Sequence, residues 1–382
     1  MTERGGNRHL LTVLHAAERT GPPVFALRFL RWLREARPGW RTDTLFLDAG
    51  GELLDDFEAL GRVIVRDPAT SSAHPWLGGR IRDRRLREEL RDLGPLDLVH
   101  VHCAGSMWVL PLLPDAPVVC HLHELSVGLD YHLDPGARRH LVRADRYVAV
   151  ADAVRTEFLR RFDVPANRVE RQWGFVDRDA LGVQPDRAAA RADRDDFLVI
   201  ASGVRHWRKA PELFIRVAHR ARVRFPDRPW RFVWIGGGRA DSPDAYVAST
   251  DDGSTVSPVA FIDHMDEPLP LIAAADVFVL TAREDAFPLV CVEAAALGRP
   301  IVTFDNGGTT ELLRAGGCGQ VIPYPDVDAM VDALERLAAD ADERKRLGDA
   351  AAAFASEHLQ LDARGPELVA TLESTMAHGR RR

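Results

Sequence analysis

Short, unbroken runs of apolar residues alternate along the chain with longer segments in which apolar residues recur every three or four positions. Runs of the first kind are typical of parallel strands buried on both faces, and segments of the second kind are typical of amphipathic helices. The runs predict strands at 9–15, 42–48, 63–67, 96–103, 116–123, 146–151, 197–203, 230–236, 259–263, 277–282, 300–305 and 320–323. Regular alternation of this kind predicts an α/β fold built on parallel sheets.

The alternation breaks once, and this break suggests two domains. The charged stretch 187–196 indicates a linker, after which the strand–helix pattern restarts. A length of 382 residues also suits two domains better than one. We therefore predict two Rossmann-like, doubly wound domains facing each other across a cleft, at 1–180 and 181–360, followed by a helical tail. Ligands of such sheets bind beyond the carboxyl ends of the strands, so the residues that follow each strand are the candidates.

The segment after the strand at 277–282 carries the clearest candidate chemistry. Pro288 is placed to be the first residue of a helix whose only polar side chain is Glu293. A helix that is apolar all round is buried, and a carboxylate within it needs a partner or a ligand. Asp285, with Glu284 beside it, precedes this helix. Seven residues separate Asp285 from Glu293, a spacing that suits two carboxylates that bind two different hydroxyl-bearing parts of one ligand. A glutamate held by a backbone amide or an arginine is the structural alternative.

Cations follow the first strand of the second half. Arg205, Arg208 and Lys209 come between Gly203 and a helix predicted to start near Pro211. A helix amino terminus with basic side chains is an anion site, and a diphosphate is its natural ligand. Lys209 is one of only two lysines among 50 lysines and arginines. A solvated basic loop is the structural alternative.

Three further strand ends carry residues that could lie close to a ligand. A Gly-Gly turn at 307–308 and Gly21 in the first half each permit close approach of the backbone, although 307–308 also fits a plain turn. His121 and His123 share one face of a predicted strand. Their spacing suits zinc only with a third ligand, which the pattern does not place, so we expect no metal there. A hydrogen bond to substrate and a purely structural role both fit these histidines.

Composition excludes several classes of protein. A net charge of −7 argues against a general nucleic-acid-binding protein, and four cysteines without a CxxC pair argue against a zinc or disulfide framework. The chain has no apolar run of 18 residues, and residues 1–9 lack the apolar core of a signal peptide, so we expect a soluble, cytoplasmic protein. Arginine-rich helices at 24–36 and 80–92 suit either weak contact with the inner membrane face or solvated outer faces.

Taken together, these segments resemble the retaining glycosyltransferases of the GT-B fold, of the family 4 (group 1) type. The resemblance covers nearly the whole chain and is stronger in the second half. The family's E-x7-E signature reads Asp285 to Glu293, and its G-x5-K element reads Gly203 to Lys209. The strand-end histidine matches at His123.

The resemblance implies a role for each matching position. Glu293 would hold the ribose of a nucleotide sugar, Asp285 the donor sugar, and Lys209 the diphosphate. Implied catalytic residues are His123, Arg208, Lys209 and Asp285, and implied donor-binding residues are Gly21, Arg205, Met265, Glu284, Phe287, Pro288, Leu289 and Glu293. The chain departs from the family pattern at Val204, where an arginine is usual, so that Arg205 or Arg208 must supply the second cation. Ala210 and Asp263 stand where the family has glycine.

The implied reaction moves a sugar from a UDP- or GDP-sugar to a hydroxyl of a glycan, glycolipid or small natural product. It retains the anomeric configuration and uses no metal and no cofactor, with a phosphate oxygen as the base. The last helix, at 361–382, would cross back to the first domain. Two alternatives stay open: a non-catalytic nucleotide-sugar-binding homologue, and a phosphorylase or epimerase on the same fold.

Overall fold

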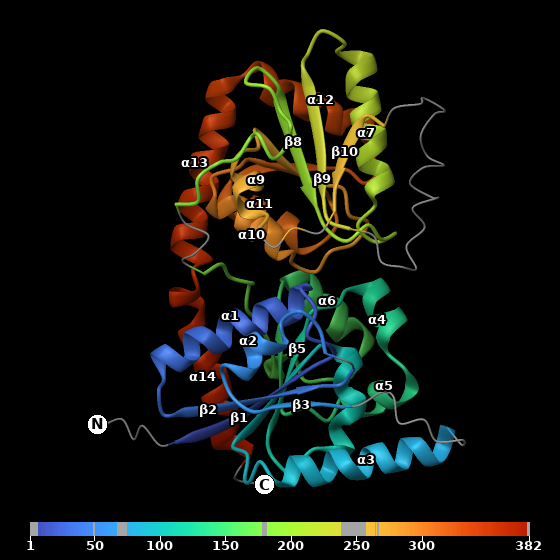
Figure 1. Cartoon of the computed structure of the whole chain (residues 1–382), viewed down its shortest axis with the longest axis vertical. Helices are drawn as coiled ribbons and strands as arrows, with labels where there is room; N and C mark the ends of the chain where they lie inside the picture. The colour runs from blue at the N-terminus through green and yellow to red at the C-terminus, as the bar shows by residue number, and fades with distance from the viewer. Residues whose placement is uncertain are drawn as a thin grey trace. The chain divides into compact units, whose positions relative to one another are not determined.

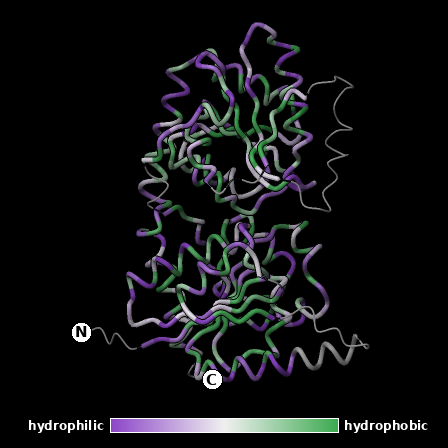
Figure 2. The backbone as a smooth tube through the Cα atoms, viewed as in Figure 1, coloured by the Kyte–Doolittle hydropathy of each residue, from purple (hydrophilic) through white to green (hydrophobic). Residues whose placement is uncertain are grey.

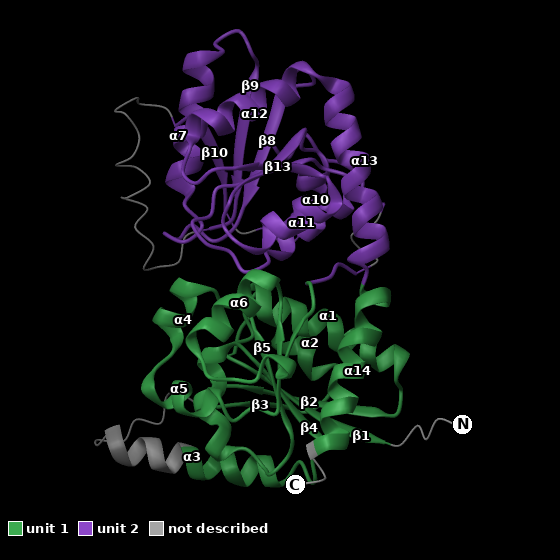
Figure 3. Ribbon diagram, turned by 180° about the vertical axis from the view of Figure 1, so that it is seen from behind, with its two compact units in different colours: residues 1–173, 361–382 green, residues 174–360 purple. Residues whose placement is uncertain are grey.

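The computed structural model describes residues 7–48, 50–66, 75–177, 182–237, 257–263, 265 and 267–379. The chain divides into two compact units (Figure 3), one of Met1–Trp173 with Leu361–Arg382 and one of Gly174–Gln360. In both units the strands are among the hydrophobic stretches of the chain (Figure 2), as the unbroken apolar runs predicted.

The first unit is a parallel sheet of seven strands in the order β3-β2-β1-β4-β5-β6-β7, with helices between them (Figure 1). Its elements are β1 Arg8–Leu14, α1 Gly21–Ala36, β2 Trp40–Phe46, α2 Leu54–Glu58, β3 Val63–Val65, α3 Pro75–Arg91, β4 Leu98–His102, the 3-10 helix η1 Ala104–Leu112, β5 Val118–Leu122, α4 Ser126–His132, α5 Pro135–Leu141, β6 Arg146–Ala149, α6 Asp152–Arg161, the 3-10 helix η2 Ala166–Arg168, β7 Val169–Arg171 and α14 Leu361–Gly379. The order reverses between β1 and β4, which makes this the topological switch point of the sheet.

The C-terminal helix α14 belongs to the first unit. Helix α14 packs on α1, where Gly365 lies against the ring of Trp32: a Cβ on this glycine would be 2.7 Å from the ring. The indole Nε1 of Trp32 also donates to Asp362 at 3.0 Å. A small residue at 365 therefore permits the close approach of the two helices.

The apolar side of α1 is covered within the unit. Phe25, Leu30 and Leu33, which sit among the arginines of this helix, are all buried. This face therefore forms part of the core. No helix among the residues described is both long and apolar enough to span a membrane.

The second unit is a parallel sheet of six strands in the order β10-β9-β8-β11-β12-β13. Its elements are β8 Phe197–Ser202, α7 Pro211–Arg224, β9 Trp230–Ile235, β10 Val259–Ile262, α9 Leu269–Ala273, β11 Val277–Leu280, α10 Leu289–Ala296, β12 Ile301–Phe304, α11 Gly308–Gly316, β13 Gly319–Ile322, α12 Val327–Ala339 and α13 Ala341–His358. Helices α7 and α12 pack together, and α10 and α11 both pack on α13, as expected for a sheet covered on two faces. The order reverses between β8 and β11.

The stretch 187–196, expected as a linker, belongs to the second unit. The Arg187 guanidinium donates to the carbonyl oxygen of Ala274 at 3.1 Å and pairs with Asp276 at 3.3 Å. The Arg231 guanidinium in turn donates to the carbonyl oxygen of Ala190 at 2.9 Å. Arg187 and Ala190 therefore anchor this stretch in the second unit, and the linker prediction was wrong here.

Candidate functional site

Two loops leave the switch point of the second sheet side by side. One follows β8 and leads into α7, and the other follows β11 and leads into α10. Ligands of doubly wound sheets bind at the point where the strand order reverses. The loop between β12 and α11 adjoins them, because β12 pairs with β11.

A compact cluster of charges joins the first two loops. The Lys209 ammonium contacts the Asp285 carboxylate directly, and Arg208 Nη1 lies 3.6 Å from the same oxygen, Oδ2. Arg208 also donates to the backbone oxygen of Glu284 at 3.1 Å. Lys209 and Asp285 are largely buried, with 15% and 8% of their side chains exposed. Two cations thus converge on one carboxylate at the edge where an anionic ligand is expected.

The backbone of these loops is fixed by hydrogen bonds and close contacts. Asn306 donates to the carbonyl oxygen of Ala282 at 3.0 Å, and the Asp285 backbone bridges to Gly307. A Cβ on Gly308 would lie 1.8 Å from the carbonyl oxygen of Ala286, so only glycine fits there. The Gly-Gly turn thus fits β12–α11 closely against the loop that carries Asp285.

An ion pair absent from the sequence interpretation braces the same region. Arg283 Nη2 lies 2.5 Å from Glu212, which is buried in the first turn of α7. Nη1 of Arg283 also donates to the backbone oxygen of Trp207 at 2.6 Å. The arginine therefore ties the loop after β11 to the loop and helix after β8. The sequence signal was Glu212 beside the apolar residues that begin α7, a place where a buried carboxylate favours a partner.

Helix α10 begins one residue later than predicted. Pro288 is its N-cap, with extended backbone, and Leu289 is its first residue. Glu293 is buried in the second turn of the helix, with 9% of the residue exposed, and Phe287 is buried just before the helix. The predicted carboxylates thus stand at the mouth of α10 (Asp285) and inside it (Glu293).

The two arginines that compete for the role of second cation lie in different places. Arg208 adjoins Lys209, whereas Arg205 pairs with Asp263 at 2.9 Å and lies over the ring of Phe261. Arg205 is therefore directed to the end of β10, the strand after which Met265 follows. Among the described contacts, the cation that shares Asp285 with Lys209 is Arg208.

Ala210, at a position where the related pattern has glycine, adopts a left-handed backbone with φ of 54°. L-residues other than glycine are disfavoured in this region by contact of Cβ with the backbone. The loop therefore has the shape that a glycine would give it, although the residue is alanine.

The first unit places its candidates after β1 (Gly21) and after β5 (His123). Gly21 is the first residue of α1, with open space where a Cβ would lie. His123 follows β5, and its Nε2 is 3.1 Å from Nδ1 of His102 at the end of β4. Burial lowers the pKa of His123 to about 3, so the ring is neutral at pH 7. His123 stacks on His121, its neighbour on the same strand face, as the alternation predicted.

Glu124 is a buried acid that the sequence interpretation missed. Burial raises the pKa of its carboxyl to about 7, although the carboxylate accepts the backbone N–H of His123 at 2.9 Å. The sequence shows a polar residue at the strand end, but its burial depends on the packing of η1. All four cysteines are free, as expected.

One group of histidines in the described chain has the proximity of metal ligands. His100, His102 and His121 are buried, and one ring nitrogen from each lies within 4.8 Å of the others. The group contains His121 but not His123 of the predicted HxH pair, and its other two rings come from β4.

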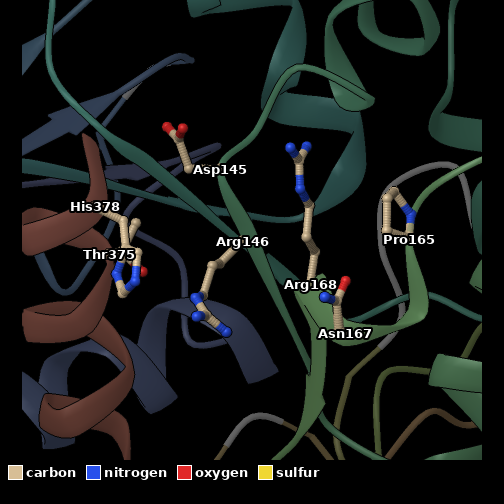
Figure 4. A pocket seen from close by; sticks show the side chains of 7 residues that line it. All are labelled: Asp145, Arg146, Pro165, Asn167, Arg168, Thr375 and His378. Carbon is tan, nitrogen blue, oxygen red and sulfur yellow. The ribbon is translucent and has the colours of Figure 1, made fainter. Parts of the chain in front are cut away.

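A separate pocket lies at the opposite edge of the first sheet. It is lined by Asp145, Arg146, Pro165, Asn167, Arg168, Thr375 and His378 (Figure 4). Arg146 is the first residue of β6, so this pocket is at the amino ends of the strands. The Arg146 guanidinium pairs with the Glu170 carboxylate at 2.6 Å. Ligands of doubly wound sheets bind at the carboxyl ends of the strands, so this pocket beside α14 is not in the position expected of a ligand site.

Comparison with known proteins assigns both halves of the chain to one kind of enzyme. A family model described as "Glycosyl transferases group 1" matches residues 195–340, and one described as "Glycosyltransferase Family 4" matches residues 5–180. A D-inositol 3-phosphate glycosyltransferase of Kribbella flavida is 29% identical over 297 residues, which are 72% of this chain and 69% of that protein. An alpha-D-kanosaminyltransferase of Streptomyces kanamyceticus is 28% identical over 312 residues, 75% and 78% of the two chains.

Solved structures share the fold. The crystal structure of Anabaena Alr3699/HepE in complex with UDP-glucose matches with a TM-score of 0.77 at 17% identity, covering 96% of this chain and 99% of that one. WaaG, described as a glycosyltransferase involved in lipopolysaccharide biosynthesis, matches with a TM-score of 0.73 at 16% identity, covering 95% and 98%. The predicted fold class, two Rossmann-like α/β domains of GT-B type, is confirmed.

Proposed function

The chain belongs to the family 4 (group 1) glycosyltransferases, and from this premise we propose that it moves a sugar from a nucleotide-diphosphate sugar to a hydroxyl of an acceptor, with retention of configuration. The observation that carries the proposal is the convergence of Lys209 and Arg208 on Asp285 at the switch point of the second sheet. Cations at the carboxyl edge of a parallel sheet can hold a diphosphate, and a carboxylate there can accept hydrogen bonds from sugar hydroxyls.

The cations would stabilise the charge that develops on the leaving diphosphate. Lys209 supplies a point charge, and Arg208 supplies a guanidinium whose place is fixed by the Glu284 carbonyl. Such preorganised charge in a water-poor site lowers the barrier without any proton transfer. The amide groups at the start of α10 add partial positive charge at the same edge. On this proposal the reaction needs no metal, and a phosphate oxygen takes the proton of the acceptor hydroxyl.

Glu293 would bind the ribose. It stands inside an apolar helix, where a carboxylate is costly unless it accepts hydrogen bonds, and vicinal hydroxyls supply two. Asp285, at the mouth of the same helix, would bind the donor sugar once its pairing with Lys209 is exchanged for the ligand. The complex of HepE with UDP-glucose and the similarity to a D-inositol 3-phosphate glycosyltransferase support a nucleotide-sugar donor and a small hydroxylated acceptor as first trials.

Donor turnover in two variants tests the proposal. We expect Lys209→Ala and Glu293→Ala each to lower turnover at least ~10²-fold, the scale of losing one charge-stabilising contact. Lys345→Ala is the matched control, because this second lysine pairs with Asp349 on the exposed face of α13 and should have no effect. A thermal-shift screen with UDP-, GDP-, TDP- and ADP-sugars identifies the donor first. Unchanged turnover in both site variants would contradict the proposal, and activity lost in EDTA would contradict its metal-free form.

A further inference from the structure

Four imidazoles form one cluster on the face of the first sheet that packs on α1. His100 and His102 come from β4, His121 from β5 and His123 from its end. Neighbouring ring centroids are 4.3 to 5.4 Å apart. The ring of Phe25 meets those of His121 and His123 edge-on, so the cluster is sealed by an apolar side chain.

Hydrogen bonds divide the cluster into two pairs. His100 Nε2 lies 3.2 Å from His121 Nδ1, and His102 Nδ1 lies 3.1 Å from His123 Nε2. Burial lowers the pKa of all four rings, so each is neutral at pH 7 and carries one N–H. In each pair, therefore, one ring donates, and its outer nitrogen, the one that faces away from the partner ring, is bare, that is, without a proton. The other ring accepts and carries its proton on the outer nitrogen.

The surroundings decide which way the second pair is arranged. His102 Nε2 is buried without a hydrogen-bond partner among the described atoms. If His102 accepted, this nitrogen would carry an N–H with nothing to receive it, the costlier kind of buried polar group. If His102 donates, the proton is carried instead by Nδ1 of His123, the one ring of the four that is only partly buried. There, water or a ligand can accept it.

We propose that His102 is a positioning residue that fixes His123 in the Nδ1–H tautomer, so that His123 presents a hydrogen-bond donor to an oxygen of the bound sugar or acceptor. The role of His123 toward ligand rests on the proposed function. The tautomer does not, because it follows from the proton count and the burial of His102. His123 in this form is not a general base, which leaves the acceptor proton to a phosphate oxygen.

A cation held by His100, His102 and His121 is the competing use of the same rings. It needs three bare nitrogens. While the hydrogen bond between His100 and His121 lasts, only one of those two rings has a bare outer nitrogen. The cation would therefore have to break that bond and would bring uncompensated charge into an apolar site. The paired arrangement keeps both imidazole hydrogen bonds and brings in no charge, although it leaves one buried N–H, on His100 Nδ1 or His121 Nε2, without a partner among the described atoms.

Imidazole tautomers can be read directly. We would label the full-length chain with ¹⁵N-histidine, record two-bond proton–nitrogen correlations at pH 7, and assign His123 from its absence in His123→Gln. We expect the Nδ1–H form in the wild type. His102→Leu removes the donor and should shift His123 toward the Nε2–H form, whereas His102→Asn retains an N–H donor and should keep Nδ1–H. His100→Leu, which removes a ring of equal burial from the other pair, is the matched control and should leave His123 unchanged.

Three outcomes would overturn the inference. They are an Nε2–H tautomer in the wild type, an unchanged tautomer in folded His102→Leu, and stoichiometric zinc in the protein by elemental analysis after exposure to ZnCl₂ and dialysis. If His102→Leu fails to fold, the wild type and His102→Asn still decide. If the tautomers agree but no donor is turned over, the proposed function fails and the positioning role stands. If the donor is turned over but His123 is in the Nε2–H form, the positioning role fails and the proposed function stands.

Discussion

Acidification from pH 6 to pH 5 should destabilise the first unit sharply, because its histidine cluster is folded in the neutral form. Burial holds the pKa of His100 and His123 near 3 and that of His102 and His121 well below the usual 6.5. The unfolded chain binds a proton at each of these rings below pH 6.5, and the folded chain does not. Stability contributed by a lowered pKa is present above the unfolded value and is lost as the pH falls. Glu124 acts in the opposite sense, because its pKa is raised to about 7.

The size of the effect follows from the unfolded pKa values, because the folded pKa of His100 and His123 is about 3 and that of His102 and His121 is well below 6.5. Each histidine then lowers the free energy of unfolding by about 1.2 kcal/mol between pH 6 and pH 5. Glu124 is protonated in the folded chain over this range and ionised in the unfolded chain. It therefore raises the free energy of unfolding by about 1 kcal/mol between pH 6 and pH 5. The net loss is about 4 kcal/mol, a large part of the 5–15 kcal/mol typical of a domain.

Hydrogen exchange of the β4 and β5 amides measures this loss within the intact chain. After correction for the intrinsic exchange rate, protection should fall about 10³-fold from pH 6 to pH 5. His100→Leu should remove about 30% of that pH dependence, while His358→Gln, at a solvent-accessible histidine of α13, should leave it unchanged. Equal protection at pH 6 and pH 5 would refute the assignment of neutral, buried imidazoles.

Two further predictions concern the second unit. Asp285→Asn releases Lys209 from its carboxylate partner, so it should tighten the binding of UDP several-fold in calorimetry while lowering transfer; weaker UDP binding would contradict the competition between Asp285 and a diphosphate. Gly308→Ala should lower the stability by about 2 kcal/mol or more in thermal unfolding, because its Cβ would meet the Ala286 carbonyl. Gly21→Ala, with open space at its Cβ, is the control and should change stability by only a few tenths of a kcal/mol.

The strands could be predicted from the sequence because parallel strands buried on both faces leave unbroken apolar runs. Every predicted run contains a strand, with ends that differ by a few residues. The strand β7, Val169–Arg171, was missed for the converse reason. It is three residues long at the edge of the sheet, and two of its residues are charged and only partly buried. A short edge strand is specified by its neighbour β6 rather than by its own pattern.

The site could be predicted as a set of positions but not as a set of contacts. Position after a strand is a local property, which is why Lys209 and Asp285 could both be named. Their pairing depends on the adjacency of β8 and β11, two strands that are far apart in the chain. The histidine pairs likewise depend on the register of β4 against β5, which places His102 beside His121. Sequence patterns report which face a side chain occupies, and register decides what it touches.

The scarcity of lysine acquires a physical meaning at this site. Two arginines of these loops donate to backbone carbonyls: Arg208 to that of Glu284, and Arg283 to that of Trp207. A guanidinium can hold such a carbonyl and a carboxylate at once, because its donors form a rigid fork. Lys209 donates to the Asp285 carboxylate from a compact ammonium at the end of a flexible stem. Within the described contacts the arginines therefore shape the loops, and the lysine provides the charge that an incoming anion can take over from Asp285.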